Sequence, residues 1–159
     1  MSVRRISGFT MMEMMVSIAI LAIITAFAVP SFRALSQNAT LSATTSEFVG
    51  DLNQARSDAI SRKNSVTFAP VSTANWAQGW TTVDSAATQL SIRNREAAGV
   101  TATVTPNTVT NIVFNRDGTV QGWSSSIVIT ICDDRAGETG RSLAISRLGQ
   151  ITNSRLTCP

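Results

Sequence analysis

A nearly uninterrupted apolar run close to the amino terminus constrains this 159-residue chain more than any other feature. The 21 residues from Phe9 to Val29 include one charged side chain, Glu13. As an α-helix this run would be about 31 Å long at about 1.5 Å per residue, close to the thickness of a bilayer's hydrocarbon core. A helix that is apolar on every side needs lipid or a large protein around it. We therefore predict a membrane or export element in the first thirty residues.

This segment fits either an export signal that is removed or a helix that stays in the membrane. Arg4 and Arg5, followed by the apolar stretch and Ala26-Phe27-Ala28, imitate an ordinary secretory signal that is cut after Ala28. The position of Glu13 argues against that interpretation. A carboxylate inside the bilayer costs about 2.5–3.5 kcal/mol on insertion scales, and an ordinary signal has no use for it.

The composition excludes several classes of enzyme. The chain has no histidine and two cysteines. It therefore cannot build a Ser-His-Asp triad, a Cys-His dyad or a histidine-ligated zinc site. A four-cysteine metal site and an iron–sulfur cluster held wholly by thiolates are excluded as well. We expect a protein that is not an enzyme, with no cofactor and no small-molecule substrate.

The residues at the start of the apolar run carry a specific resemblance. Gly8-Phe9-Thr10-Met11-Met12-Glu13, followed by the run and by Pro30, resembles the processing site of type IV prepilins and pseudopilins. The resemblance implies that a prepilin peptidase removes residues 1–8 as a leader by cutting between Gly8 and Phe9. It also implies N-methylation of the new amino-terminal Phe9.

The same resemblance implies roles in filament assembly for Glu13 and Pro30. Glu13 becomes the fifth residue of the mature chain, and in the family this glutamate is thought to pair with the terminal amine of a neighbouring subunit. The pairing is physically reasonable because a carboxylate in lipid is tolerated only with a partner. The alternative is that Glu13 lies merely near the membrane edge. Pro30 matches the family's helix-kinking proline, since proline removes one backbone hydrogen bond.

Beyond Pro30 the apolar pattern predicts that the helix continues to about Arg62. Five residues recur at helical spacing and form one stripe: Leu41, Phe48, Leu52, Ala55 and Ala59. The polar residues 36–46 are weak helix formers, and local melting is predicted there. The segment 52–62 resembles the helix end of the GspH/FimT branch of minor pilins (FimU/FimT-like), in which an A-R-x-x-A pattern leads into the first strand.

From residue 64 onwards the period changes to two, which predicts short strands. The alternating segments are Val66–Phe68, Leu90–Ile92, Val100–Val104, Ile112–Phe114, Ile127–Ile131 and Leu143–Ile145. Asn115-Arg116-Asp117-Gly118 predicts a tight hairpin turn, and the structure of residues 71–89 is the least determined. We predict an α+β protein with the pilin fold, in which a long helix packs on a head of six to eight antiparallel strands. The predicted parts are a leader (1–8), a transmembrane and filament-core helix (9–30), an amphipathic helix half (31–63) and a β-rich globular head (64–159).

The two cysteines, Cys132 and Cys158, are expected to form a disulfide that pins the carboxyl terminus of an extracytoplasmic head. Two free thiols would require a cytosolic protein, and C-terminal disulfides are common in pilin heads. The acidic cluster Asp133, Asp134 and Glu138 could offer oxygen ligands to calcium. It lacks the spacing of a calcium loop, and we predict a solvated turn and no metal site.

Arginines dominate the C-terminal part of the chain. From Arg135 to Pro159 four arginines stand against one acidic residue, Glu138. Members of the GspH/FimT branch that bind DNA carry a basic Gly-Arg-x-Arg loop, and the matching place here, 149–152, lacks both arginines. Arg141, Arg147 and Arg155 could contact phosphates instead. The alternative, which we favour, is that these arginines keep the head soluble and pair with neighbouring subunits.

Three functions are consistent with these observations. The first is a minor type IV pilin that primes pilus assembly, at the tip, together with other minor and major pilins. The second is a DNA-binding minor pilin for uptake in natural transformation, and the third is a minor pseudopilin of a type II secretion system. All three imply a single pass of the bacterial inner membrane before assembly, and then a place in the periplasm or in an extracellular pilus.

Overall fold

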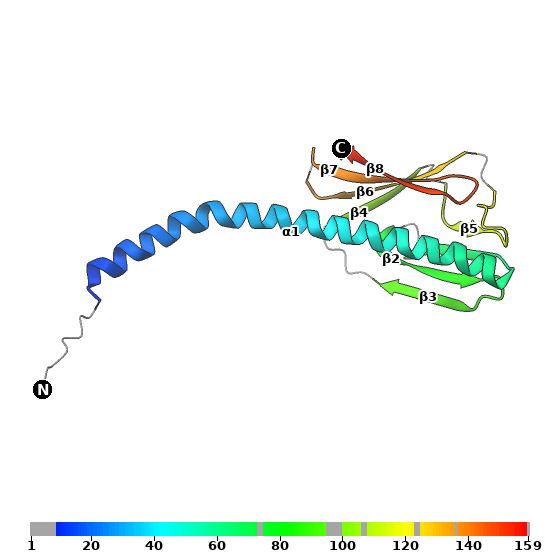
Figure 1. Cartoon of the computed structure of the whole chain (residues 1–159), viewed down its shortest axis with the longest axis horizontal. Coiled ribbons are helices and arrows are strands. Elements are labelled where there is room, and N and C mark those ends of the chain that lie inside the picture. Colours follow the sequence, from blue (N-terminus) through cyan, green and yellow to red (C-terminus); the bar gives the residue numbers. More distant parts are fainter. Residues whose placement is uncertain are drawn as a thin grey trace, which may run out of the picture. The chain divides into compact units, whose positions relative to one another are not determined.

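One long helix precedes all the strands in the computed structural model, which describes residues 9–72, 75–94, 100–105, 108–122, 125–135 and 137–158 (Figure 1). Helix α1 is Met11–Arg62. Within the described residues eight strands follow: β1 Val66–Ser72, β2 Asn75–Asp84, β3 Gln89–Asn94, β4 Val100–Thr105, β5 Ile112–Phe114, β6 Ile127–Asp133, β7 Thr139–Ile145 and β8 Ile151–Thr157. The chain divides into two compact units, of which the first ends at Ala39 and the second begins at Thr40. The α+β fold class is confirmed.

The first unit contains the N-terminal part of α1, which is residues 11–39. The Thr10 hydroxyl accepts a hydrogen bond from the backbone N–H of Glu13 (3.2 Å), which caps the first turn. The helix runs through Pro30 without interruption. The buried residues of α1 all lie at Leu41 or later, so the N-terminal part of the helix contributes nothing to a protein core.

In the second unit α1 presents the predicted apolar stripe to the strands. The five residues of the stripe are all buried: Leu41, Phe48, Leu52, Ala55 and Ala59. The predicted melting of residues 36–46 is wrong, because the helix is continuous there. Thr44 and Thr45 are buried, and their hydroxyls donate to the carbonyls of Thr40 and Leu41 at 2.8 Å. A threonine whose hydroxyl is satisfied within its own helix can be buried at little cost.

The strands form two four-stranded antiparallel sheets, with orders β3-β2-β1-β5 and β4-β6-β7-β8. Strand β8 is an edge strand that pairs with β7 from Thr139↔Thr157 to Ile145↔Ile151. The predicted hairpin turn is confirmed: Gly118 N–H donates to the Asn115 carbonyl at 2.8 Å, and Phe114 bridges Val120 beyond it.

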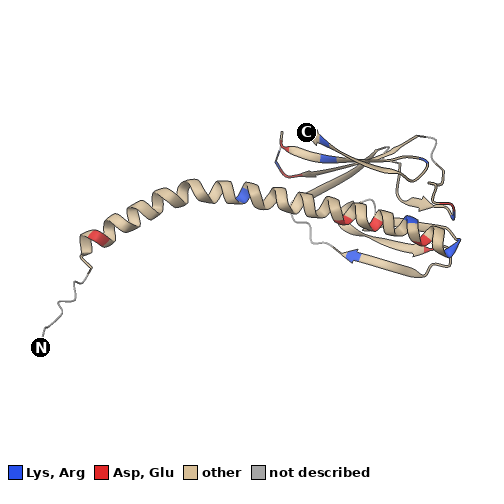
Figure 2. Ribbon diagram, in the orientation of Figure 1, with Lys and Arg blue, Asp and Glu red and all other residues tan. Residues whose placement is uncertain are grey.

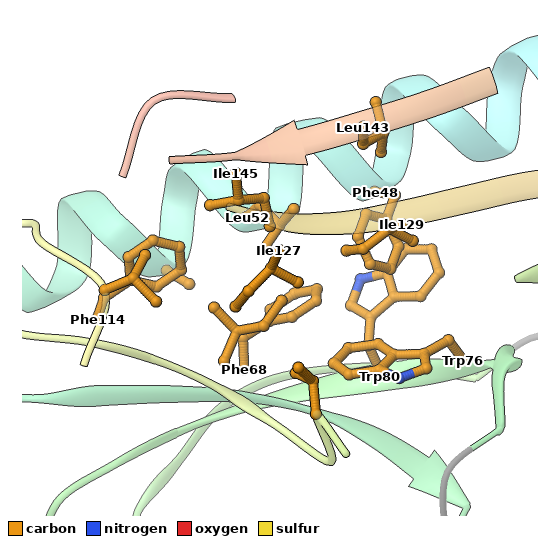
Figure 3. Close-up of a cluster of buried hydrophobic side chains, with 14 of the residues drawn as sticks. Phe48, Leu52, Phe68, Trp76, Trp80, Phe114, Ile127, Ile129, Leu143 and Ile145 are labelled. Atoms are coloured by element: carbon orange, nitrogen blue, oxygen red, sulfur yellow. The ribbon is translucent and has the colours of Figure 1, made fainter. Parts of the chain in front are cut away.

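The hydrophobic core of the second unit lies where α1 and both sheets meet (Figure 3). Phe48 of α1 contacts Phe68 of β1 and Trp80 of β2 edge-on, with ring centroids 5.3 and 4.7 Å apart. The second sheet closes the core with five fully buried side chains: Ile127, Ile129, Ile131, Leu143 and Ile145. Aromatic pairs in this geometry contribute about 0.5–1.5 kcal/mol beyond their buried area. The buried Trp76 and Trp80 fall in residues 71–89, the stretch that the sequence pattern determined least.

Candidate assembly surfaces

The N-terminal part of α1 is an apolar surface without protein cover. Gly8, on the amino side of the predicted cut, lies outside the described residues. Phe9 is 69% exposed, and Glu13 lies in the first helical turn, where the helix dipole favours an anion. Charged residues are almost absent along this part of the helix (Figure 2).

Large apolar side chains cover this part of α1 on all sides and are exposed to solvent. They include Met11, Ile18, Leu21, Phe27 and Leu35, which are all more than half exposed. The helix is long and apolar enough to cross a membrane. Soluble proteins rarely leave contiguous apolar surface of this size uncovered, so lipid or other apolar helices must cover it.

Arg56 joins the end of α1 to two turns that are distant in sequence. Its Nε donates to the Gly118 carbonyl at 2.9 Å, and one of its terminal nitrogens donates to the Leu148 carbonyl at 3.0 Å. Ala55 and Ala59 on either side are fully buried. The A-R-x-x-A pattern is thus two small buried residues around an arginine that fixes two loops. The sequence pattern assigned no role to Arg56 and so missed this one.

The turn 146–150, at the place of the family's basic loop, is tightly constrained. Gly149 has φ +71°, and a Cβ there would lie 2.2 Å from the Gly118 carbonyl oxygen and 2.6 Å from Arg56 Nε. Its N–H donates to the Ser146 carbonyl at 2.9 Å. A glycine is therefore required here by both conformation and space.

Asp51 of α1 forms a charged contact with the first sheet. Its carboxylate accepts hydrogen bonds from Trp80 Nε1 at 2.7 Å and from Arg93 Nε at 2.6 Å. Partial burial opposes ionisation of Asp51. The hydrogen bonds from Arg93 and Trp80 outweigh it, so the pKa of Asp51 lies below its ordinary value of 3.8. This contact links the helix to both β2 and β3.

A disulfide joins Cys132 of β6 to Cys158, with a Cα–Cα distance of 5.9 Å. It encloses β7 and β8, and Cys158 N–H donates to the Glu138 carbonyl at 2.9 Å. Closing a loop of this length stabilises a domain by about 3.5 kcal/mol on chain-entropy arithmetic. Gly140 packs directly against the bridge, because a Cβ there would lie 2.4 Å from Cys158 Sγ. The C-terminal disulfide is confirmed.

The acidic turn after β6 contains an internal ion pair. Arg135 forms a salt bridge with Asp133, whose side chain is 5% exposed, and its Nε donates to Asp133 Oδ2 at 2.9 Å. This guanidinium holds the pKa of Asp133 below its ordinary value. Within the described ranges, no three His, Cys, Asp or Glu residues are grouped closely enough to hold a metal ion.

The structure brings together two of the three arginines that were considered as possible contacts for DNA. Arg141 of β7 and Arg155 of β8 are direct cross-strand partners. Both line a polar groove between β8 and α1. Arg147 lies beyond the end of β7, exposed and outside this groove.

Comparisons with known proteins agree with this architecture. A family model described as type II transport protein GspH matches residues 44–149, and a model of the prokaryotic N-terminal methylation motif matches residues 3–29. A search of curated proteins found no match. Two crystal structures of the type IV minor pilin FimU of Pseudomonas aeruginosa share the fold at 23% sequence identity. Their TM-scores are 0.66 and 0.61; they cover 76% and 72% of this chain, and 92% of each FimU chain is covered.

The GspH model covers more than half of the chain, and the methylation motif coincides with the exposed apolar helix. The family implies processing by prepilin peptidase and assembly with other pilins. The chain therefore belongs to the GspH family of pilin-like structural proteins, which are not enzymes, and it is anchored in the inner membrane before it assembles with other pilins.

Proposed function

We propose that this chain is a minor type IV pilin that primes assembly of the pilus at its tip. Prepilin peptidase cuts it between Gly8 and Phe9, and the new terminal amine of Phe9 is methylated. Glu13 pairs with the amine of a neighbouring subunit. The partners are the other minor pilins and the major pilin, first in the inner membrane and then in the fibre.

The observation that carries this proposal is the exposed apolar part of α1, with Glu13 in its first turn. A side chain that is costly in lipid is retained where it gains a partner of opposite charge. An anchor that only had to hold a head in the membrane would gain nothing from this carboxylate. The fold shared with the type IV minor pilin FimU supports the same assignment.

Intact mass spectrometry of the mature chain and analysis of sheared filaments test the proposal together. The mature chain should begin with methylated Phe9 and be present in filaments. Glu13→Gln should still be processed and should lose incorporation at least tenfold, because an amide cannot neutralise the amine. A mature chain that begins at Val29 would identify an ordinary secretory signal. Normal piliation after deletion of the gene would contradict a role in priming.

A minor pseudopilin of a type II secretion system is the second candidate, and the description of the matching family as a type II transport protein favours it. The two functions differ in what the cell loses. Deletion should reduce piliation and leave secretion unchanged if the proposed function holds, whereas the reverse result would establish the pseudopilin.

A DNA receptor for natural transformation is the third candidate, favoured by the shared groove of Arg141 and Arg155. Such a receptor should shift DNA in gels, more weakly as salt increases. The variant Arg141→Gln with Arg155→Gln should lose that shift. Absent binding, or binding that ignores both salt and these substitutions, would exclude this route.

A further inference from the structure

We propose that the groove between α1 and β8 is a docking site for a carboxylate side chain of a neighbouring pilin subunit, with Arg141 and Arg155 as its ligands. The inference rests on the proposed function, because it requires a filament neighbour. It adds the chemistry of one contact between subunits, on the head and away from the membrane helix.

The groove is small and rich in hydrogen-bond donors. Its volume is about 250 Å³. Its walls carry Arg141 of β7, Asn153 and Arg155 of β8, and the hydroxyl-bearing residues Ser42, Thr45 and Ser46 of α1. Ser42, Ser46 and Arg155 are exposed at its mouth. A space of this size takes one or two side chains, and guanidinium groups bind carboxylates through paired hydrogen bonds.

The two arginines are placed where the isolated chain gains nothing from them. They are direct partners across β7 and β8, and like charges at such positions, with Cβ atoms about 5 Å apart, destabilise a sheet. Within the described residues, neither guanidinium has an ion pair or a hydrogen bond. By contrast, Arg93 of the edge strand β3 forms a salt bridge with the carboxylate of Asp51. The groove therefore holds two positive charges that lack an anion.

The direction of the side chains aims both charges into the groove. Side chains alternate along a strand, so Arg141 shares a face of β7 with Leu143 and Ile145, and both of these are buried against the core. Arg155 shares that face of β8, as the register shows. The apolar core thus ends in a polar recess, where an inserted carboxylate would be partly shielded from water and its ion pairs strengthened.

The geometry favours a single carboxylate over a nucleic-acid backbone. Arg147 lies in the turn after β7, six residues beyond Arg141 in the sequence, and outside the groove. Nucleic-acid strands present a phosphate about every 3.4 Å along the axis and are bound by a continuous basic track. Two adjacent guanidinium groups in a recess match one acidic side chain instead.

Charge substitutions in the full-length chain, produced in its own cells, test the proposal. For the variant Arg141→Gln with Arg155→Gln, the amount of protein in sheared filaments relative to its level in the membrane should be at least tenfold lower than for the wild type. The purified variant should keep its disulfide and unfold at the same temperature as the wild type or at a higher one, since a like-charge repulsion is removed. Arg147→Gln, outside the groove, is the matched control and should assemble normally.

A rescue experiment identifies the anion. Arg155→Glu should block incorporation, and changing one acidic residue of a co-assembling pilin to arginine should restore it at least tenfold. Normal incorporation of both groove variants would overturn the proposal, as would an equal defect in Arg147→Gln or a failure of every rescue. Normal incorporation with lost DNA uptake would assign the groove to nucleic acid. Absence of the wild-type chain from filaments would refute the proposed function itself, and the docking site with it.

Discussion

Single side chains fix the loops of the head to α1, and Arg56 does so most directly. It donates to the carbonyls of Gly118 and Leu148 at 2.9 and 3.0 Å. Arg56→Ala removes two charge-assisted hydrogen bonds and should lower the free energy of unfolding by about 2 kcal/mol. Arg56→Lys should recover only part of that loss. A lysine keeps the positive charge, but its ammonium lacks the forked donors of the guanidinium.

Urea unfolding followed by tryptophan fluorescence measures the effect of these Arg56 variants. Arg62→Ala is the control, since Arg62 is exposed in the last turn of α1, and it should change stability by no more than about 0.5 kcal/mol. An equal loss in both alanine variants would mean that Arg56 contributes only general charge.

Asp51 makes the stability of the head depend on pH at the acidic end. Its pKa in the folded protein lies below the ordinary 3.8, so its contribution is complete above about pH 4 and is lost as the pH falls through the folded pKa. Asp51→Asn should cost on the order of 1 kcal/mol at pH 7, since Arg93 is nearly half exposed and water screens the pair. Once the pH lies below the folded pKa of Asp51, the variant and the wild type should converge.

A double-mutant cycle with Arg93 checks the cause of this pH dependence. Arg93→Gln should flatten the same part of the stability profile, and the double variant should lose less than the sum of the single losses. Full additivity of the two losses would show that the Asp51–Arg93 contact is not responsible.

At the scale of elements, the disulfide and the start of β7 form one packed unit around Gly140. A Cβ on Gly140 would lie 2.4 Å from Cys158 Sγ and 2.8 Å from the Ile131 carbonyl oxygen. Gly140→Ala should therefore destabilise the head by about 1–3 kcal/mol and slow closure of the bridge. Non-reducing electrophoresis and thermal unfolding measure both effects.

Gly50 provides the opposite control for the Gly140 substitution. It lies exposed within α1, and nothing within 4 Å would meet an added Cβ. Gly50→Ala should stabilise the helix by about 0.5–1 kcal/mol. A Gly140→Ala variant that is as stable as the wild type, with its disulfide formed, would contradict the packing argument.

Secondary structure with a strong local pattern was predictable from the sequence, and the remaining elements depend on distant contacts. The stripe of α1 and the strands near Ile112, Ile127 and Leu143 follow their periodicity. Strand β2 was obscured by its Gly79 and by its small polar residues. Strand β8 was missed because an edge strand that is mostly exposed has no apolar alternation.

The contacts that organise the surfaces could not be predicted from local pattern. Arg56 reaches carbonyls 62 and 92 residues away, and Asp51 meets Arg93 across 42 residues. Each looks like an ordinary solvated charge on a helix until the fold is known. The processing motif is the opposite case, since its residues are contiguous and carry their chemistry in the sequence itself.

For the whole molecule, the distribution of burial predicts that the second unit folds without the first. The buried residues of α1 begin at Leu41, and the core cluster lies entirely within the second unit. Residues 40–159, secreted to the periplasm with a cleavable signal, should form a soluble monomer with the Cys132–Cys158 bridge. Its free energy of unfolding should match that of the full chain in detergent within about 0.5 kcal/mol, because no core contact is removed.

Near-ultraviolet circular dichroism and sedimentation measure this outcome. The signal of the packed Trp76 and Trp80 should be unchanged, whereas the full-length chain should need detergent or lipid to stay dispersed. A 40–159 fragment that aggregates, or that loses the aromatic signal, would show that residues before Thr40 support the core. If the head folds alone, the N-terminal part of α1 is free to serve membrane anchoring and then filament packing, and neither role has to be balanced against the stability of the head.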